Sequence, residues 1–186
     1  MFRAFGVAEN KMRLILPFEL ERPDPSIAIL PELIDFVSSH GPNLLAVGGL
    51  EPEYSHTFTI DAIAEIADRF PKAGLMIVGS GSLEDELRDH IAGKPYAKNI
   101  CLVIDIAHSI LLHLIARADV LLRLTQYDGD AISVREALFL NTPVIATDTG
   151  MRPDGVRLGA RGLDAAELME RIADAVAAER KASDGD

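Results

Sequence analysis

The chain has 186 residues, of which 48% are hydrophobic, and it carries a formal net charge of −11 at pH 7. This length and hydrophobic content predict one globular domain that is large enough to bury a core. This negative charge argues against a nucleic acid or an anionic membrane as partner, because both bind to clustered lysine and arginine side chains. The lone cysteine, Cys101, lies in an apolar run, so we expect a buried thiol, no disulfide framework and a cytoplasmic location.

The first part of the chain has weak secondary-structure signals. Residues 11–17 form a short apolar run that we interpret as a strand, the prolines of residues 21–25 predict a loop, and residues 27–37 have helical spacing. We expect no secretory signal peptide and no bilayer-spanning segment, because no apolar run is long enough.

From residue 43 onward, apolar runs alternate with segments of helical spacing. Strands are expected at residues 44–48, 74–79, 100–104, 119–124, 143–146 and 155–158. Helices are expected at residues 58–70, 83–91, 109–118, 133–140 and 165–178. Strands that are apolar on both faces and separated by helices form parallel sheets covered on both sides. The predicted fold class is therefore α/β, a doubly wound parallel sheet of about six strands.

The stretch from Tyr127 to Leu138 leads from a strand through a loop into a helix and is the centre of the predicted site. Ligands of doubly wound sheets bind beyond the carboxyl ends of the strands, where the strand order reverses. The first strand runs into Gly48 and Gly49 and the fourth into the loop at Asp128, so we expect the crevice between these loops. Free backbone N–H groups at the helix N-terminus would hold a diphosphate or a sugar hydroxyl there, and they belong to Gly129, Asp130 and Ala131.

Glu136 follows about one helical turn into this helix. A carboxylate has two acceptor oxygens, which match the two vicinal hydroxyls of a ribose, and Asp128 would then accept a hydrogen bond from the sugar. The alternative makes Asp128 a turn acid and Glu136 a solvated helix residue. The residues alone leave both interpretations open.

Other motifs carry less information. The loop of Gly79 and Gly81 lacks the third glycine of a dinucleotide fingerprint and is equally compatible with a structural turn. His108 and His113 favour a helix cap or a packed imidazole over a metal pair. No acidic pair has a spacing suited to Mg²⁺, so we expect neither a metal nor another cofactor.

Six segments in order along the chain resemble the C-terminal, donor-binding half of GT-B glycosyltransferases, specifically the retaining group 1 or family 4 enzymes. They are residues 45–53, 75–81, 118–120, 127–129, 136–137 and 142–150. The resemblance implies a Rossmann-like domain in which Glu136 binds the nucleotide ribose and the backbone near Ile106 borders the base. It also implies that Asp128, in place of the usual glutamate, faces the transferred sugar.

This chain differs from the family in one chemical feature of the predicted site. Family members carry an arginine and a lysine that neutralise the diphosphate leaving group, at the positions of Gly49 and Tyr54. We expect Arg123 to replace this charge, because an arginine among leucines at a strand end should have a partner facing the crevice. Arg135 and Arg152 are further candidates, and the alternative is that Arg123 pairs with a nearby aspartate for structural reasons.

The second departure is size, because a GT-B enzyme has two such domains and this chain has room for one. We expect an interdomain-type segment and helix in residues 1–42, the nucleotide-sugar-binding domain in residues 43–178 and a flexible tail in residues 179–186. The resemblance implies retaining hexose transfer from a nucleoside diphosphate sugar to a sugar or lipid-linked acceptor, as in polysaccharide biosynthesis. The acceptor site would come from an N-terminal domain or a partner chain, through which a peripheral membrane association stays open.

Two other functions stay open at this point. One is a non-catalytic nucleotide-sugar-binding or regulatory module, in which the missing arginine and lysine record lost chemistry. The other is a nucleotide-sugar epimerase, which would need an acid and base pair that the sequence does not display. The acids at Asp128 and Glu136, with Gly129 between them, weigh against the non-catalytic module.

Overall fold

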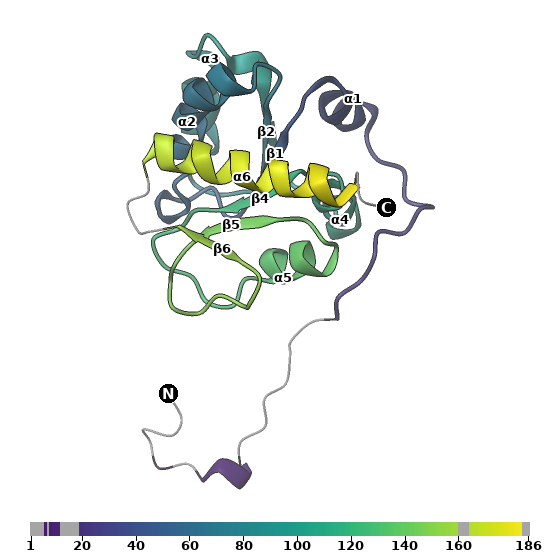
Figure 1. The fold of residues 1–186 in the computed structure, drawn as a ribbon, viewed down its shortest axis with the longest axis vertical. Helices are drawn as coiled ribbons and strands as arrows, with labels where there is room; N and C mark the ends of the chain where they lie inside the picture. Colours follow the sequence, from purple (N-terminus) through teal and green to yellow (C-terminus); the bar gives the residue numbers. More distant parts are fainter. Residues whose placement is uncertain (1–5, 7, 12–18, 160–163, 184–186) are drawn as a thin grey trace.

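The computed structural model describes residues 6, 8–11, 19–159 and 164–183. Its six strands form one sheet in the order β3-β2-β1-β4-β5-β6, and every strand pairs in parallel with its neighbours. The strands are β1 Asn43–Val47, β2 Gly74–Val78, β3 Ile100–Val103, β4 Val120–Arg123, β5 Val144–Thr147 and β6 Arg157–Gly159. The predicted doubly wound, six-stranded α/β fold is confirmed (Figure 1).

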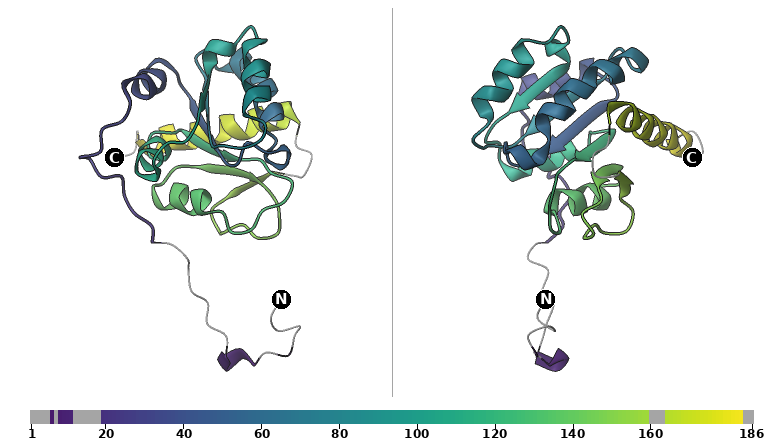
Figure 2. Two further views of the ribbon diagram at one scale, coloured as in Figure 1. Left: turned by 180° about the vertical axis from the view of Figure 1, so that it is seen from behind. Right: turned by 90° about the vertical axis from the view of Figure 1, so that its left-hand side faces the viewer.

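Helices cover both faces of this sheet (Figure 2). They are α1 Pro31–Ser39, α2 His56–Arg69, α3 Glu84–Ala92, α4 His108–Ile115, α5 Ile132–Phe139 and α6 Ala165–Ser183. The described residues also form short 3₁₀ helices at Glu9–Lys11, Pro52–Tyr54 and Ala97–Asn99. Each predicted helix from residue 58 onward is found within a few residues of its expected bounds.

The core consists of two apolar clusters, one on each face of the sheet. Leu44 packs with α2, α3 and α6 on one face, whereas its neighbour Leu45 packs with α1, α4 and α5 on the other. This division follows from the strand geometry, because successive side chains point to opposite faces. Both leucines are at most 2% exposed, so β1 is buried on both sides, as in other parallel sheets.

The ends of the chain differ from their predicted structure. The helix predicted at residues 27–37 begins only at Pro31, because a proline favours the first turn of a helix and residues before it stay extended. Lys11 ends a 3₁₀ helix, and the rest of the predicted strand at 11–17 lies outside the described residues. Helix α6 continues past residue 178 as far as Ser183.

None of the helices in the described part of the chain is long and apolar enough to cross a membrane. The longest is α6, with 19 residues, and its described side chains alternate between the core and the surface.

The strand order reverses between β1 and β4, which lie side by side at the centre of the sheet. Their carboxyl ends, at Val47 and Arg123, therefore frame the crevice that the fold class predicts. The loops after β1 and β2 pack closely there, since a Cβ atom on Gly79 would overlap the carbonyl oxygen of Gly48. This contact gives Gly79 a structural role.

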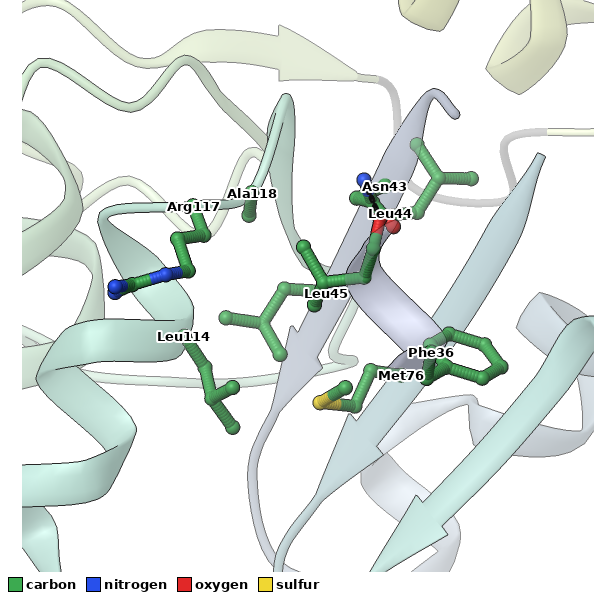
Figure 3. Close-up of a pocket in the computed structure, with 9 residues that line it drawn as sticks. Phe36, Asn43, Leu44, Leu45, Met76, Leu114, Arg117 and Ala118 are labelled. Atoms are coloured by element: carbon green, nitrogen blue, oxygen red, sulfur yellow. Dashed lines mark hydrogen bonds between the residues drawn. The ribbon is translucent and has the colours of Figure 1, made fainter. Parts of the chain in front are cut away.

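A small cavity lies at the opposite, amino-terminal end of β1. Figure 3 shows the residues that line this cavity near Asn43, the first residue of β1, among them Leu45, Met76 and Leu114, with the guanidinium of Arg117 pointing away. The cavity has a volume of about 10 Å³. Its volume is about that of one water molecule, so it cannot hold a nucleotide.

Candidate functional site

A pocket of about 300 Å³ opens at the carboxyl ends of β1 and β2. It brings together three predicted site residues, Gly48, Gly49 and Ile106, although Ile106 comes from the loop before α4. The other lining residues are Val47, Val78, Gly79, Ser80, Asp105 and Leu111. A volume of this size lies at the lower end of the range for small-molecule sites, about 300–1,000 Å³.

Asp128 lies in the loop between β4 and α5 and accepts hydrogen bonds from two arginines. Arg123 Nε and Arg152 Nη1 each donate to Asp128 Oδ2 at 2.8 Å. The three side chains are between 2% and 13% exposed. Burial by itself raises the pKa of Asp128, but the hydrogen bonds and positive charges of the two arginines outweigh it and hold the pKa below its ordinary value. Asp128 is therefore a carboxylate at neutral pH.

Arg123 is held on several sides at the end of β4. Its Nη1 donates to the carbonyl of Val47 at 2.5 Å, and its guanidinium lies 4.7 Å from the centre of the Tyr54 ring. The same ring lies against Gly48, where an added Cβ atom would come within 2.5 Å of it. Asp128 is thus the partner that we expected for Arg123 at the end of its strand. This ion pair also agrees with the alternative that Arg123 pairs with a nearby aspartate for structural reasons. The two roles are compatible, because a guanidinium has five N–H donors.

The cluster of Arg123, Asp128 and Arg152 carries two positive charges and one negative charge. In addition, Arg152 Nη2 is buried and has no hydrogen-bond partner among the described residues. A buried donor without a partner is costly, and an excess of positive charge in a protein interior favours an anion nearby. The cluster therefore has both the charge and a spare donor for an anionic group.

Glu136 is buried in α5, at 3% exposure, which rules out the alternative of a solvated helix residue. His108, the first residue of α4, places its Nε2 atom 2.6 Å from Glu136 Oε1. His113 is buried, with Nε2 2.8 Å from the carbonyl of Asp24, and is the packed imidazole expected of one of the two histidines. The described residues contain no group of His, Cys, Asp and Glu side chains that could hold a metal ion.

The three residues before α5 were predicted to supply backbone donors, and none of them lines the pocket. Ala131 is the N-cap and makes no side-chain cap hydrogen bond, so no side chain of this cap takes up the N–H groups of the first turn. Asp130 accepts a hydrogen bond from Arg135 Nε at 2.6 Å on the surface, so Arg135 is directed away from Glu136. Gly129 is exposed, has open space around it and has no left-handed φ, so the backbone does not require glycine there.

Two histidines contribute to the site in ways that the sequence analysis did not predict. The Nε2 atom of His56 lies 2.9 Å from the carbonyl oxygen of Gly49. Burial lowers the pKa of its imidazole, so the ring is neutral and donates this hydrogen bond to the loop after β1. His108 contacts Glu136 across 28 residues of sequence. Of these two histidines, only His108 could have been predicted from the sequence as a site residue, because it follows Ile106 closely in a loop predicted to border the crevice.

We expect Asp128→Asn to lower the free energy of unfolding by about 1–3 kcal/mol at pH 7, because two buried arginines lose their counter-charge. The folded-state pKa of Asp128 lies below the unfolded value, so the carboxylate stabilises the fold above about pH 4 and this contribution is lost as the pH falls further. The difference between wild type and variant in urea unfolding should therefore shrink at low pH. Asp130→Asn removes one partner of the exposed pair with Arg135 and should change the free energy of unfolding by less than about 0.5 kcal/mol. Equal stability of Asp128→Asn and wild type at pH 7 would contradict the role of the cluster.

Many solved structures share this fold, among them the following three. The pneumococcal O-GlcNAc transferase GtfA in complex with UDP and GlcNAc has 19% identity and a TM-score of 0.59, over 73% of this chain and 28% of GtfA. Anabaena HepE in complex with UDP has 18% identity and a TM-score of 0.65, over 81% of this chain and 43% of HepE. The C-terminal domain of the group 1 glycosyl transferase LpcC from Francisella tularensis has 15% identity and a TM-score of 0.65, over 85% of this chain and 86% of that domain.

These identities support the fold alone, and this chain spans less than half the length of GtfA and HepE. No curated protein matches the sequence significantly. A family model for the glycosyl transferases group 1, however, matches residues 37–182, which is most of the chain. Together with the six-stranded parallel sheet, this match shows that the chain belongs to the group 1 glycosyl transferase family.

Proposed function

We propose that this domain binds a nucleoside diphosphate sugar in the crevice between β1 and β4 and supplies the donor half of a retaining hexosyltransferase. The observation that carries the proposal is the buried carboxylate of Glu136 in α5, which contacts His108 at the start of α4, just after the loop that lines the pocket. Its two oxygens can accept hydrogen bonds from the two hydroxyls of a ribose. The UDP bound in GtfA and HepE, which share the fold, supports a nucleotide as ligand.

The base is assigned to the pocket beside Ile106. This pocket combines the backbone of Gly48, Gly49 and the loop before α4 with apolar side chains of β1, β2 and α4. A flat heterocycle suits such a lining, because apolar walls accept its faces and backbone groups can pair with its polar edge.

The diphosphate is assigned to the arginine cluster and the N-terminus of α5. Arg123 and Arg152 supply the net positive charge, and the uncapped first turn of α5 supplies backbone donors. Charge that develops on the leaving diphosphate is stabilised most by donors already in place, which is how transferases lower this barrier. We assign no metal and no cofactor, since arginines and a helix N-terminus can provide the charge.

Asp128 is assigned to the transferred sugar. Both arginines bind Oδ2, so Oδ1 is the oxygen that we assign to a sugar hydroxyl. In this arrangement Asp128 also holds the two guanidinium groups at the diphosphate, which ties recognition of the sugar to recognition of the leaving group.

The acceptor site is assigned to an N-terminal domain or a partner chain, because this chain spans less than half the length of GtfA and HepE. The proposed acceptor is a sugar or a lipid-linked sugar of cytoplasmic polysaccharide synthesis, and any peripheral membrane contact would be made by that other half. By itself, the chain should bind donor and catalyse weakly.

One observation favours a second function, a non-catalytic nucleotide-sugar-binding module. The ring of Tyr54 fills the space beside Gly48 and lies under Arg123, where group 1 enzymes carry cations for the diphosphate. If Arg123 does not replace those cations, the crevice would bind nucleotides without transferring sugar. No contact in the described residues favours the epimerase.

A nucleotide panel tests donor binding directly. We expect one of UDP, GDP and ADP, or its sugar, at a concentration of about 100 Kd, to raise the melting temperature by roughly 5–10 °C. Glu136→Ala should abolish this shift and keep the fold, whereas Glu167→Ala, at an exposed pair with Arg171 on α6, should retain it. An unchanged shift in Glu136→Ala would refute the ribose assignment, and no shift with any nucleotide would contradict donor binding by this chain.

The diphosphate assignment predicts a selective loss. Arg123→Ala should weaken binding of the nucleoside diphosphate about tenfold, because one charged hydrogen bond is lost, and leave binding of the nucleoside nearly unchanged, as measured by titration calorimetry. Arg123→Lys should retain part of the affinity, and Arg88→Ala, at an exposed pair on α3, is the control. Equal losses for the diphosphate and the nucleoside would make Arg123 a structural residue.

A further inference from the structure

The side chains of His108 and Glu136 form a contact between α4 and α5. His108 is 59% exposed in its side chain, whereas the side chain of Glu136 is 4% exposed. Among the described residues, His108 is the only side chain that is hydrogen-bonded to the Glu136 carboxylate, and the distance of 2.6 Å is short. The main anchor of a buried carboxylate is thus a solvent-accessible imidazole.

The position of His108 links Glu136 to the pocket. The loop before α4 contributes Asp105 and Ile106 to the pocket, and Leu111 contributes again one turn into the helix. His108 lies between these residues in the chain and reaches across to α5. It occupies Glu136 Oε1, so Oε2 is the oxygen with no hydrogen bond to a described residue.

We propose that His108 is a positioning residue that holds the Glu136 carboxylate for ribose and thereby sets a preference for ribonucleotides over nucleotides that lack ribose hydroxyls. This inference rests on the proposed function. A glutamate side chain has several rotatable bonds, and fixing it before the ligand arrives removes an ordering cost from binding. Without His108, the carboxylate loses its anchor, and the loss falls on the ribose hydroxyls rather than on the base or the diphosphate.

The test compares, by titration calorimetry, a nucleoside diphosphate from the panel of UDP, GDP and ADP with its 2′,3′-dideoxy form. His108→Ala should raise the Kd of the ribonucleotide about tenfold and that of the dideoxy form less than about twofold, so that the discrimination between them falls. His108→Gln retains an N–H donor and should restore the ribonucleotide Kd to within about threefold of wild type.

A matched control lies elsewhere on the surface. His90 of α3 forms a similar pair with Asp61 of α2, at 2.8 Å, so His90→Ala removes an imidazole from a carboxylate without touching the crevice. It should change neither Kd.

The outcomes separate this inference from the proposed function. An equal loss for both nucleotides in His108→Ala, no loss for either, or no rescue by His108→Gln would overturn the positioning role and leave the donor site intact. A wild-type chain that binds none of the ribonucleotides, or that binds them equally well after Glu136→Ala, would overturn the proposed function and this inference with it.

Discussion

A single carboxylate, Asp128, ties three separate parts of the crevice together. Through Arg123 it is joined to the end of β4 and to the carbonyl of Val47 on β1, and through Arg152 to the loop after β5. Backbone hydrogen bonds also join these loops, as from the N–H of Gln126 to the carbonyl of Glu53, and Asp128 adds side-chain contacts that reach the loop after β5. The shape of the proposed diphosphate site therefore depends on whether this carboxylate keeps its charge.

The source of the positive charge distinguishes this chain from the family pattern. At the positions after β1 where an arginine and a lysine are expected, it has Gly49 and Tyr54, and we propose that Arg123 of β4 and Arg152 of the loop after β5 supply the positive charge. The guanidinium of Arg123 lies over the face of the Tyr54 ring, and a cation in this position is attracted by the aromatic ring.

Hydrophobic patterning was sufficient to predict the sheet, because β1 and β2 are apolar on both faces and only a covered parallel sheet can bury such strands. It also predicted that Gly48 and Gly49 border the site, but the pocket that they line lies at the ends of β1 and β2 and includes no residue of the loop after β4. It could not predict the pair of His108 and Glu136, which depends on how α4 and α5 pack across 28 residues of sequence. The pattern also could not predict that Glu136 is buried, because its residue type does not tell whether the side chain lies on the buried or the exposed face of the helix.

The central claim, that a nucleotide is held between β1 and β4 by Glu136, is tested most directly by a crystal structure of this chain soaked with the nucleotide that stabilises it. The account predicts ribose hydroxyl oxygens within about 2.5–3.0 Å of the Glu136 carboxylate. It also predicts the base beside Ile106 and the diphosphate beside Arg123. A nucleotide bound elsewhere on the chain, or in the crevice with its ribose turned away from Glu136, would contradict it.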